Sequence, residues 1–371
     1  MKSILITGAN GFIGKNLALA LGRIVQTEII ATDVDTPKRE YERGLDACDV
    51  AFHLAGVNRP PKEEDFETGN VGSLARLLAG LEIRKKRPLI VLSSSIQALL
   101  DNPYGRSKRR AEQLLFDHAS RTGTPARIFR LPGVFGKWCR PNYNSVVATL
   151  CYNIARDLPT SISDPTKEID IVHVGDVVEA FIELAGRVIE GAAFGDVSPS
   201  FRITLGRLVE ILSEFRKGRE SLRLADLSDP LLRRLFSTYL SYLPSDGFSY
   251  SVESKSDMRG TLAELLKAGG HGQIFVSRTK SGVTRGNHYH DFKVEKFIVL
   301  QGDAIIRFRH MSTEEIVQYT VSGNQFRIVD IPPGWTHSIE NTGPDEMIVL
   351  FWSSEVFDPA RPDTYAAEVL K

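Results

Sequence analysis

The chain has 371 residues, more than one hydrophobic core usually supports, so two domains are expected. Its 46 basic and 46 acidic side chains cancel, which leaves no basic face and argues against nucleic acid as a partner. No apolar run approaches the ~20 residues that span a bilayer, and no signal-peptide pattern precedes the first strand, so a cytoplasmic protein without membrane insertion is expected.

Up to about residue 130, short apolar runs alternate with amphipathic stretches. The runs predict strands at Ser3–Thr7, Glu28–Asp33, Val50–Leu54, Leu89–Ser93 and Ala126–Leu131, with helices at Ile13–Leu21, Gly69–Gly80 and Ser107–Ala119 between them. Strands that alternate with helices indicate an α/β fold with a doubly wound parallel sheet of the Rossmann type. Further helices are expected at 142–156 and 204–216, and a strand end followed by a helix at 171–186.

A glycine-rich segment follows the first expected strand and opens the first expected helix. Glycines there let the backbone turn tightly and approach a pyrophosphate at the helix N-terminus. An acidic residue ends the second strand, the position at which such folds bind the cofactor ribose, and a carboxylate there favours NAD. Small residues end the third strand and leave room for a cofactor. The predicted cofactor-binding residues here are Gly8, Asn10, Gly11, Phe12, Ile13, Gly14, Asp33, Leu54, Ala55 and Gly56.

A tyrosine and a lysine four residues apart follow the Ser-rich end of the fourth strand. The segment Tyr104–Lys108 is expected to begin a helix, and Tyr104 and Lys108 lie on one face of it. A nearby ammonium group favours the phenolate, so the Tyr104 pKa is expected to lie below its usual value of ~10. A tyrosine of this kind can donate a proton to an alkoxide that forms when a ketone is reduced, and a serine hydroxyl can orient the same oxygen.

The sequence changes character near Pro244, where Ser228–Leu243, an expected helix, ends. Short strands with Gly and Pro turns follow, at Gly272–Ser277, Lys296–Leu300, Ala304–His310, Ile316–Val321, Gln325–Asp330 and Met347–Trp352. This pattern predicts an all-β jelly-roll barrel. The expected domains are therefore 1–245 and 246–371.

Four metal-ligand side chains lie within the expected barrel. His288 and His290 are two residues apart and would point to the same side of a strand, while Glu295 and His337 come from later stretches. Three imidazoles and a carboxylate suit zinc, iron, manganese or nickel. The sequence therefore predicts a metal site at these four positions.

The N-terminal motifs resemble the extended short-chain dehydrogenase/reductase family over roughly residues 1–240. The resemblance implies that Ser95, Tyr104 and Lys108 form the catalytic group, that Tyr104 and Lys108 also contact the cofactor, and that Leu131 lies beside the nicotinamide. Extended members usually act on nucleotide-linked sugars. Relatives contact substrate through the region that holds Asn142 and Asn144, and the alternative is that these two residues cap the following helix.

The C-terminal motifs resemble the cupin superfamily over about residues 250–365. Cupins carry two sequence motifs, and the second one contains His337 in this chain. Phe326 replaces the glycine that usually begins the second motif, which leaves the length of the loop undetermined but does not affect the assignment of His337 as a ligand. Cupins include dioxygenases, isomerases, storage proteins and sugar-binding modules, so the fold alone does not define an activity. Fusion to a reductase favours a cupin-type sugar epimerase.

Loop and linker segments resemble one bifunctional family of bacterial capsule and O-antigen synthesis, which makes the precursor of UDP-N-acetyl-L-fucosamine. The matching segments are Ser93–Ala98, Asp101–Gly105, Gly136–Cys139, Pro141–Val146, Ser237–Pro244, Gly286–His288 and Asp358–Pro359.

The resemblance implies that the cupin domain inverts C3 of a UDP-2-acetamido-2,6-dideoxy-4-hexulose. The reductase domain then reduces the C4 ketone with NADPH to UDP-N-acetyl-6-deoxy-L-talosamine. It also implies a homodimer with zinc, or another divalent metal, at the four ligands. Because Asp33 favours NADH whereas the relatives use NADPH, the phosphate preference stays open. Lys296 and Tyr289 are candidates for proton transfer in the epimerase.

Three alternatives remain at this point. The first is a single-function NAD(P)-dependent nucleotide-sugar reductase whose cupin serves as a binding or dimerisation module. The second is a regulatory protein that senses NAD(P) on a degenerate reductase scaffold, against which the intact catalytic group argues. The third is an iron-dependent cupin dioxygenase, which metal analysis would reveal.

Overall fold

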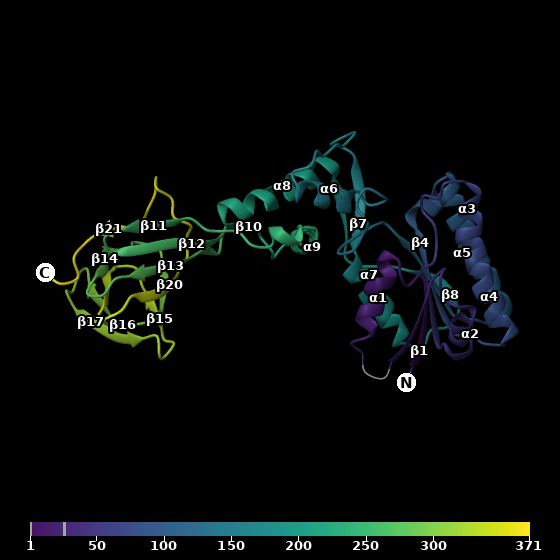
Figure 1. Cartoon of the computed structure of the whole chain (residues 1–371), viewed down its shortest axis with the longest axis horizontal. Helices are drawn as coiled ribbons and strands as arrows, with labels where there is room; N and C mark the ends of the chain where they lie inside the picture. The colour runs from purple at the N-terminus through teal and green to yellow at the C-terminus, as the bar shows by residue number, and fades with distance from the viewer. Residues whose placement is uncertain (1, 25–26) are drawn as a thin grey trace. The chain divides into compact units, whose positions relative to one another are not determined.

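The computed structural model describes residues 2–24 and 27–371. Contacts divide the chain into two compact units, each with its own core (Figure 1). The first unit comprises the residues up to Leu212 together with Arg234–Leu243, and the second comprises Ser213–Arg233 and Pro244–Lys371. Within the described residues, no helix is both long and apolar enough to cross a membrane.

The first unit is built on a parallel sheet with the order β2-β1-β3-β4-β5-β8. Its strands are β1 (Lys2–Thr7), β2 (Thr27–Thr32), β3 (Val50–His53), β4 (Leu89–Ser95), β5 (Ala126–Leu131) and β8 (Ala192–Gly195). All neighbouring pairs run parallel, so the predicted α/β sheet is confirmed. The order reverses at β1, between β2 and β3, and ligands of such sheets bind at the strand ends beside this point.

Helices cover both faces of this sheet (Figure 1). One face packs against α1 (Phe12–Leu21) and α7 (Val174–Ala185), and the other against α2 (Lys38–Ala47), α4 (Ser73–Ile83) and α5 (Pro103–Thr122). Helix α2 was not predicted because few of its residues are apolar. It nevertheless packs closely, since a Cβ atom at Gly44 would lie 2.7 Å from Leu5 Cδ1.

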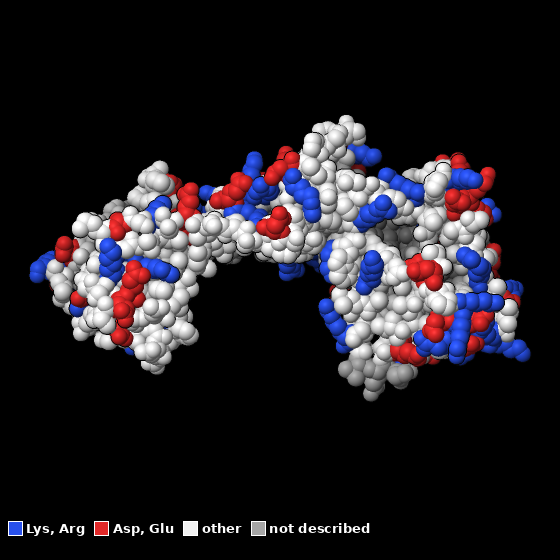
Figure 2. All heavy atoms as spheres, in the orientation of Figure 1, with Lys and Arg blue, Asp and Glu red and all other residues white. Residues whose placement is uncertain are grey.

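The remaining elements of the first unit are smaller. A three-stranded sheet has the order β6-β7-β9. The elements are α3 (Glu64–Phe66), a π-helical turn (Glu67–Gly72), a 3-10 turn (Ile96–Leu99), β6 (Gly133–Phe135), α6 (Val146–Ile154), β7 (Glu168–His173) and β9 (Ser200–Thr204), while α8 (Leu205–Ser221) and α9 (Pro230–Leu240) contribute residues to both units. On the face that Figure 2 shows, basic and acidic side chains of this unit are interspersed.

The second unit consists mostly of β-strands in two sheets. One sheet has the order β10-β12-β13-β20-β15-β18, with β11 also paired to β12, and the other has the order β17-β16-β19-β14-β21. Of the expected jelly-roll barrel, the described residues therefore show two separate sheets and no closed barrel. The strands are β10 (Arg223–Leu224), β11 (Ser254–Asp257), β12 (Gly260–Ala268), β13 (Gly272–Thr279), β14 (Thr284–Tyr289), β15 (Glu295–Gln301), β16 (Asp303–His310), β17 (Ile316–Ser322), β18 (Ile328–Ile331), β19 (Trp335–Asn341), β20 (Met347–Ser353) and β21 (Tyr365–Ala366), and a 3-10 turn lies at Ser245–Gly247.

Both sheets contribute alternate side chains to a single apolar core in this unit. Every second residue of β20 is buried, from Met347 to Ser353, as the period of two of a strand requires. Phe297 and Phe351 meet edge to face, with ring centroids 4.6 Å apart. Phe297 also lies against His337, with centroids 5.7 Å apart, so the aromatic core borders the predicted metal ligands directly.

Candidate functional site

The glycine-rich loop joins β1 to α1 at the edge of the sheet where ligands bind in this architecture. Gly8 has a φ of +71°, and a Cβ atom there would lie 2.6 Å from the backbone nitrogen of Ala55. A Cβ atom at Gly14 would lie 2.3 Å from the carbonyl oxygen of Gly8. Gly11 begins the helix without a side-chain cap, so a bound pyrophosphate can accept from the amides of the first turn.

Asp33 lies beside this loop, directly after β2. Its carboxylate accepts hydrogen bonds from the backbone nitrogens of Asn10 and Val34, both at 2.8 Å. A cavity of about 590 Å³ next to the loop is lined in part by Ala9, Asn10 and Trp138. The structure thus brings the predicted fingerprint residues and Asp33 together.

The segment after β3 completes this edge of the predicted cofactor site. Leu54 donates its backbone N–H to the carbonyl of Thr7, at 3.0 Å, which holds the segment against β1. A Cβ atom at Gly56 would lie 2.7 Å from Asn70 Oδ1 and 3.3 Å from Lys108 Nζ. The small residue therefore leaves room where the segment after β3 approaches Asn70 and the predicted catalytic lysine.

The predicted catalytic residues come from the end of β4 and the first turns of α5. Asn102 caps α5, since its Oδ1 accepts from the Gly105 nitrogen at 2.8 Å, and Pro103 begins the helix. Burial raises the Tyr104 pKa, and this outweighs the hydrogen bond with Ser95, which lowers it. The expected lowering of the Tyr104 pKa was therefore wrong for the protein without cofactor, because desolvation of the phenolate dominates.

Lys108 is buried next to the tyrosine. Its Nζ lies 5.9 Å from the Tyr104 ring centroid and donates to the carbonyl oxygen of Ser93 at 3.1 Å. Burial lowers the Lys108 pKa to about 8, while the negative charge of Glu112 opposes this shift. Lys108 therefore keeps its positive charge at neutral pH with little margin.

A buried ion pair supports α5, and the sequence reasoning missed it. Glu112 follows Lys108 by one helical turn and accepts from Arg130 at 2.6 Å and from Ser94 Oγ at 2.5 Å. Arg130 lies next to Leu131 on β5, and Leu131 pairs in register with Ser95. The spacing of four between Lys108 and Glu112 was the available signal.

A second buried polar group, in the π-helical turn, was also missed. The Asn70 side chain donates to Ser107 Oγ at 2.9 Å and holds the backbone of Val57 through two hydrogen bonds, at 2.9 and 3.1 Å. It thereby joins the segment after β3 to the catalytic helix. His53, the last residue of β3, bonds Thr7 Oγ1 at 2.8 Å, and burial lowers its pKa to about 3.

Asn142 and Asn144, the predicted substrate contacts, are exposed on the segment before α6. Neither caps that helix, because Ser145 is the cap and accepts from the Ala148 nitrogen at 3.3 Å. Asn142 has a φ of 53° and donates its backbone N–H to Thr149 Oγ1 at 2.9 Å. The capping alternative is therefore excluded, and both side chains remain available to a ligand.

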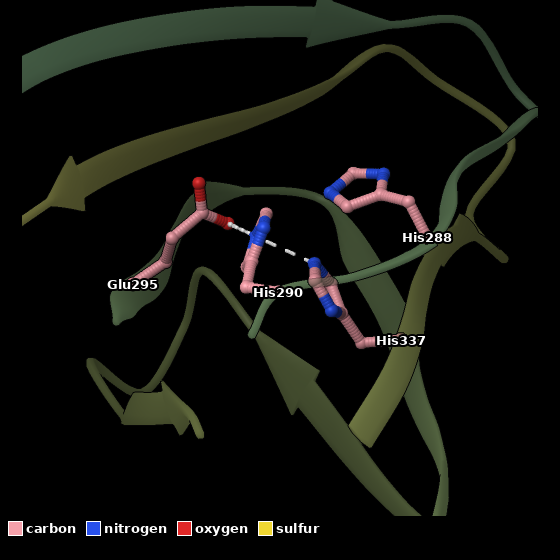
Figure 3. A group of neighbouring side chains, drawn as sticks. All are labelled: His288, His290, Glu295 and His337. Atoms are coloured by element: carbon pink, nitrogen blue, oxygen red, sulfur yellow. Dashed lines mark ion pairs between the residues drawn. The ribbon is translucent and has the colours of Figure 1, made fainter. Parts of the chain in front are cut away.

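The four predicted metal ligands meet at one point of the second unit (Figure 3). Their ligand atoms all lie within 4.8 Å of one another, and Glu295 Oε2 lies 3.4 Å from His290 Nε2 and 3.7 Å from His337 Nε2. His288 lies on β14, and His290 directly follows the last residue of that strand. Glu295 lies on β15 and His337 on β19. A register shift between Gly286 and His288 places His288 opposite His337.

The donor set fits a metal ion. His290 Nε2 and both ring nitrogens of His337 are buried without a hydrogen-bond partner, and a bound cation would give a partner to His290 Nε2 and to one of the His337 nitrogens. Burial lowers the pKa of His288 and lowers that of His337 to about 3, so both rings are neutral ligands at pH 7. Burial alone would raise the Glu295 pKa, but His290 and its neighbours lower it and keep the carboxylate charged.

Neither candidate for proton transfer points into this cluster. Lys296 is exposed on the side of β15 opposite Glu295 and pairs with Asp330. The Tyr289 ring instead packs against Tyr365, with centroids 5.3 Å apart. A lysine that the sequence reasoning did not single out, Lys293, is buried with its Nζ 3.7 Å from Glu295 Oε1.

Two family models match the chain. The NAD dependent epimerase/dehydratase family matches residues 4–197, and the polysaccharide biosynthesis C-terminal domain matches residues 255–365. A curated relative from Pseudomonas aeruginosa strain PA103, UDP-2-acetamido-2,6-beta-L-arabino-hexul-4-ose reductase, is 44% identical over 366 residues, which cover 99% of this chain and 98% of the relative.

Solved structures agree with this relationship. The capsular polysaccharide assembling protein CapF from Staphylococcus aureus superposes with a TM-score of 0.90 at 44% identity, and the match covers 99% of this chain and 100% of that one. The chain therefore belongs to the NAD dependent epimerase/dehydratase family, in the group that joins such a domain to a polysaccharide biosynthesis C-terminal domain and that includes this reductase and CapF.

Proposed function

We propose that the protein is a bifunctional nucleotide-sugar enzyme. The second unit inverts C3 of UDP-2-acetamido-2,6-dideoxy-4-hexulose, and the first unit reduces the C4 ketone with NAD(P)H to UDP-N-acetyl-6-deoxy-L-talosamine. The observation that carries this proposal is that one chain holds two separate clusters, a Ser-Tyr-Lys group beside a nucleotide loop and a His₃Glu group. The full-length relative named as a UDP-hexulose reductase supports the substrate class.

The order of the two steps follows from carbonyl chemistry. A ketone at C4 acidifies the proton on C3, because the carbanion that remains is stabilised as an enolate. Once C4 is an alcohol, that stabilisation is gone. Epimerisation therefore precedes reduction, and the reductase acts on the C3-inverted ketone.

For the reduction, we assign proton donation to Tyr104 and orientation of the substrate oxygen to Ser95. Because burial raises the Tyr104 pKa, its hydroxyl carries the proton that the alkoxide needs as hydride reaches C4. The Lys108 ammonium group, charged at neutral pH, stabilises negative charge as it develops on the tyrosine. Gly8, Gly11 and Gly14 hold the cofactor pyrophosphate, and Asn142 and Asn144 contact the sugar nucleotide.

For the epimerisation, His288, His290, Glu295 and His337 would hold zinc or another divalent metal. Such an ion polarises a ketone and stabilises enolate charge when it is bound. Glu295 is kept ionised and the His288 and His337 rings neutral, which is the protonation state that a cation requires. Lys293, buried beside Glu295, replaces Lys296 as the lysine to test for contact with substrate.

The remaining assignments extend the same proposal. We place the enzyme in the cytoplasm, in capsule or O-antigen synthesis, as a homodimer that uses NADPH or NADH. A second candidate function keeps the reductase alone and gives the second unit a binding or dimerisation role. Both hypotheses predict reduction, so only the C3 step separates them.

The decisive experiment is deuterium uptake at C3 of the UDP-4-keto sugar in D₂O without nicotinamide, followed by NMR. We expect uptake by the wild-type protein and by Tyr104→Phe, and none by His337→Ala. His271→Ala is the matched control, because His271 is exposed in the same unit outside the cluster. An active, metal-loaded wild type without uptake would leave only the single-function reductase.

A further inference from the structure

The C-terminal segment of the chain returns to the strand that carries His288. Strand β21 pairs with β14 at two positions, Ala366 opposite His288 and Tyr365 opposite Tyr289. Beyond it, Ala367 donates to the carbonyl of Asn287 at 2.9 Å. The segment therefore forms part of the wall around the His₃Glu cluster.

One residue of this segment, Asp363, contacts the metal-ligand region at four points. Its Oδ1 accepts from the backbone nitrogen of Asp291 at 3.0 Å, and its Oδ2 accepts from those of Phe292 at 3.0 Å and Lys293 at 2.7 Å. Its own carbonyl oxygen lies 2.7 Å from His290 Nδ1. A single residue thus holds both a ligand ring and residues 291–293 of the loop between His290 and Glu295.

The bond to the carbonyl determines which nitrogen of His290 can bind a cation. A carbonyl oxygen only accepts, so Nδ1 must carry the proton and donate it. The Nε2 lone pair is then free, and Nε2 is the buried atom that has no partner and lies 3.4 Å from Glu295 Oε2. Hydrogen bonds of this kind fix the tautomer and the ring orientation of metal-binding histidines.

The carboxylate of Asp363 keeps this carbonyl in place. Asp363 has a φ of 38°, a backbone conformation that is uncommon for a residue other than glycine. Three charge-assisted hydrogen bonds from consecutive backbone nitrogens offset that strain and fix the loop to the C-terminal segment. The neighbouring Thr364 Oγ1 also accepts from Lys293 Nζ at 3.1 Å, and that Nζ lies 3.7 Å from Glu295 Oε1.

We propose that Asp363 is a positioning residue for the metal centre, which sets His290 through its backbone carbonyl and the 291–293 loop through its carboxylate. The proposal rests on the proposed function, because it presumes that the His₃Glu cluster binds a divalent cation. The residue that it adds, Asp363, follows the last ligand, His337, by 26 positions. The side chain of Asp363 itself does not touch the ion.

The test compares zinc affinity by competition with a chelator, and the visible spectrum of the cobalt(II)-substituted protein, in three full-length variants. Asp363→Asn removes the charge, and Asp363→Gly removes the side chain while glycine accepts the positive φ. Asp358→Asn is the matched control, since Asp358 is exposed in the same segment and its side chain accepts from the Ala360 nitrogen, at 2.9 Å, rather than from the metal-ligand region. We expect a loss of affinity of about 10- to 100-fold and an altered cobalt spectrum in both Asp363 variants, with Asp358→Asn unchanged.

Wild-type affinity and an unaltered cobalt spectrum in both Asp363 variants would overturn the proposal while leaving the metal centre intact. A wild-type protein that binds no zinc or cobalt would instead overturn the metal centre itself. Thermal unfolding of the metal-free forms, together with NADPH binding by the first unit, checks that each variant is folded. A variant that unfolds is set aside, and the other Asp363 variant then decides the outcome.

Discussion

Replacement of Glu112 by Gln tests whether the buried ion pair between Glu112 of α5 and Arg130 stabilises the fold and also keeps Lys108 positively charged. Glu112 is 2% exposed and accepts three hydrogen bonds from the Arg130 guanidinium, the shortest at 2.6 Å. The variant leaves Arg130 with a neutral partner whose amide group repels one of its N–H groups. Breaking a buried pair from one side costs about 3–5 kcal/mol.

The expected loss lies at the lower end of this range, because the Arg130 side chain is 29% exposed and water can reach it. About 3 kcal/mol corresponds to a fall in Tm of roughly 6–12 °C for a unit of this size. Glu82→Gln is the matched control. Glu82 accepts two hydrogen bonds from Arg121, which also lies in α5, so this is a second arginine–glutamate pair that involves the same helix. Its side chains are 61% and 45% exposed, so solvent screens the pair and its loss should lower the Tm much less than the loss of the Glu112 pair.

The same substitution should also change the pH dependence of reduction. Glu112 raises the pKa of Lys108, which burial has lowered to about 8. Without that charge, Lys108 loses its proton at a lower pH, so the alkaline decline of kcat/KM should begin closer to neutrality. Equal Tm values for Glu112→Gln and Glu82→Gln, with superimposable pH profiles, would refute this account of the pair.

Three further predictions concern other parts of the first unit. Gly14→Ala should abolish NADPH binding and spare zinc binding, because the new Cβ atom would lie 2.3 Å from the Gly8 carbonyl oxygen. Fluorescence titration with NADPH measures this, and a variant that keeps its cofactor affinity would contradict the prediction. Tyr104→Phe should lose hydride transfer yet keep NADPH affinity, which stopped-flow absorbance of NADPH would show, and unchanged turnover would remove Tyr104 as proton donor. The free energy of unfolding should fall as the pH is lowered from about 6.5 towards 3, by up to ~1.4 kcal/mol per pH unit, because only the unfolded chain protonates His53 in that range. Denaturant midpoints measured across this range should depend less steeply on pH in His53→Gln than in the wild type.

Much of the first unit could be predicted because its strands are buried on both faces and read as apolar runs. All five predicted strands are present, with ends shifted by at most two residues. Helix α2 was missed because its sequence is mostly charged and only a narrow face, including Leu45, reaches the core. The start of α5 was predicted to within one residue by the Tyr104–Lys108 pair, whereas the apolar pattern begins only at Ser107, because the Asn102 cap and Pro103 add a polar first turn.

The site residues were predictable as a set, but their environment was not. Spacing alone indicated that Tyr104 and Lys108 share a helix face, and that His288 and Glu295 belong to one cluster. The Tyr104 pKa was misjudged because burial cannot be read from a short motif. Asp363 lies 73 residues from His290, so no local pattern could have connected the two.

The shortness of β21 has a practical consequence for anyone who shortens or tags this protein. These two residues form the outer edge of the five-stranded sheet, and they cover β14, which is six residues long. Removal of the residues after Pro362 would leave the backbone amides and carbonyls of β14 open to pair with a neighbouring molecule. Aggregation of such a truncated protein would then reflect an uncovered strand, and expression trials should keep this segment intact.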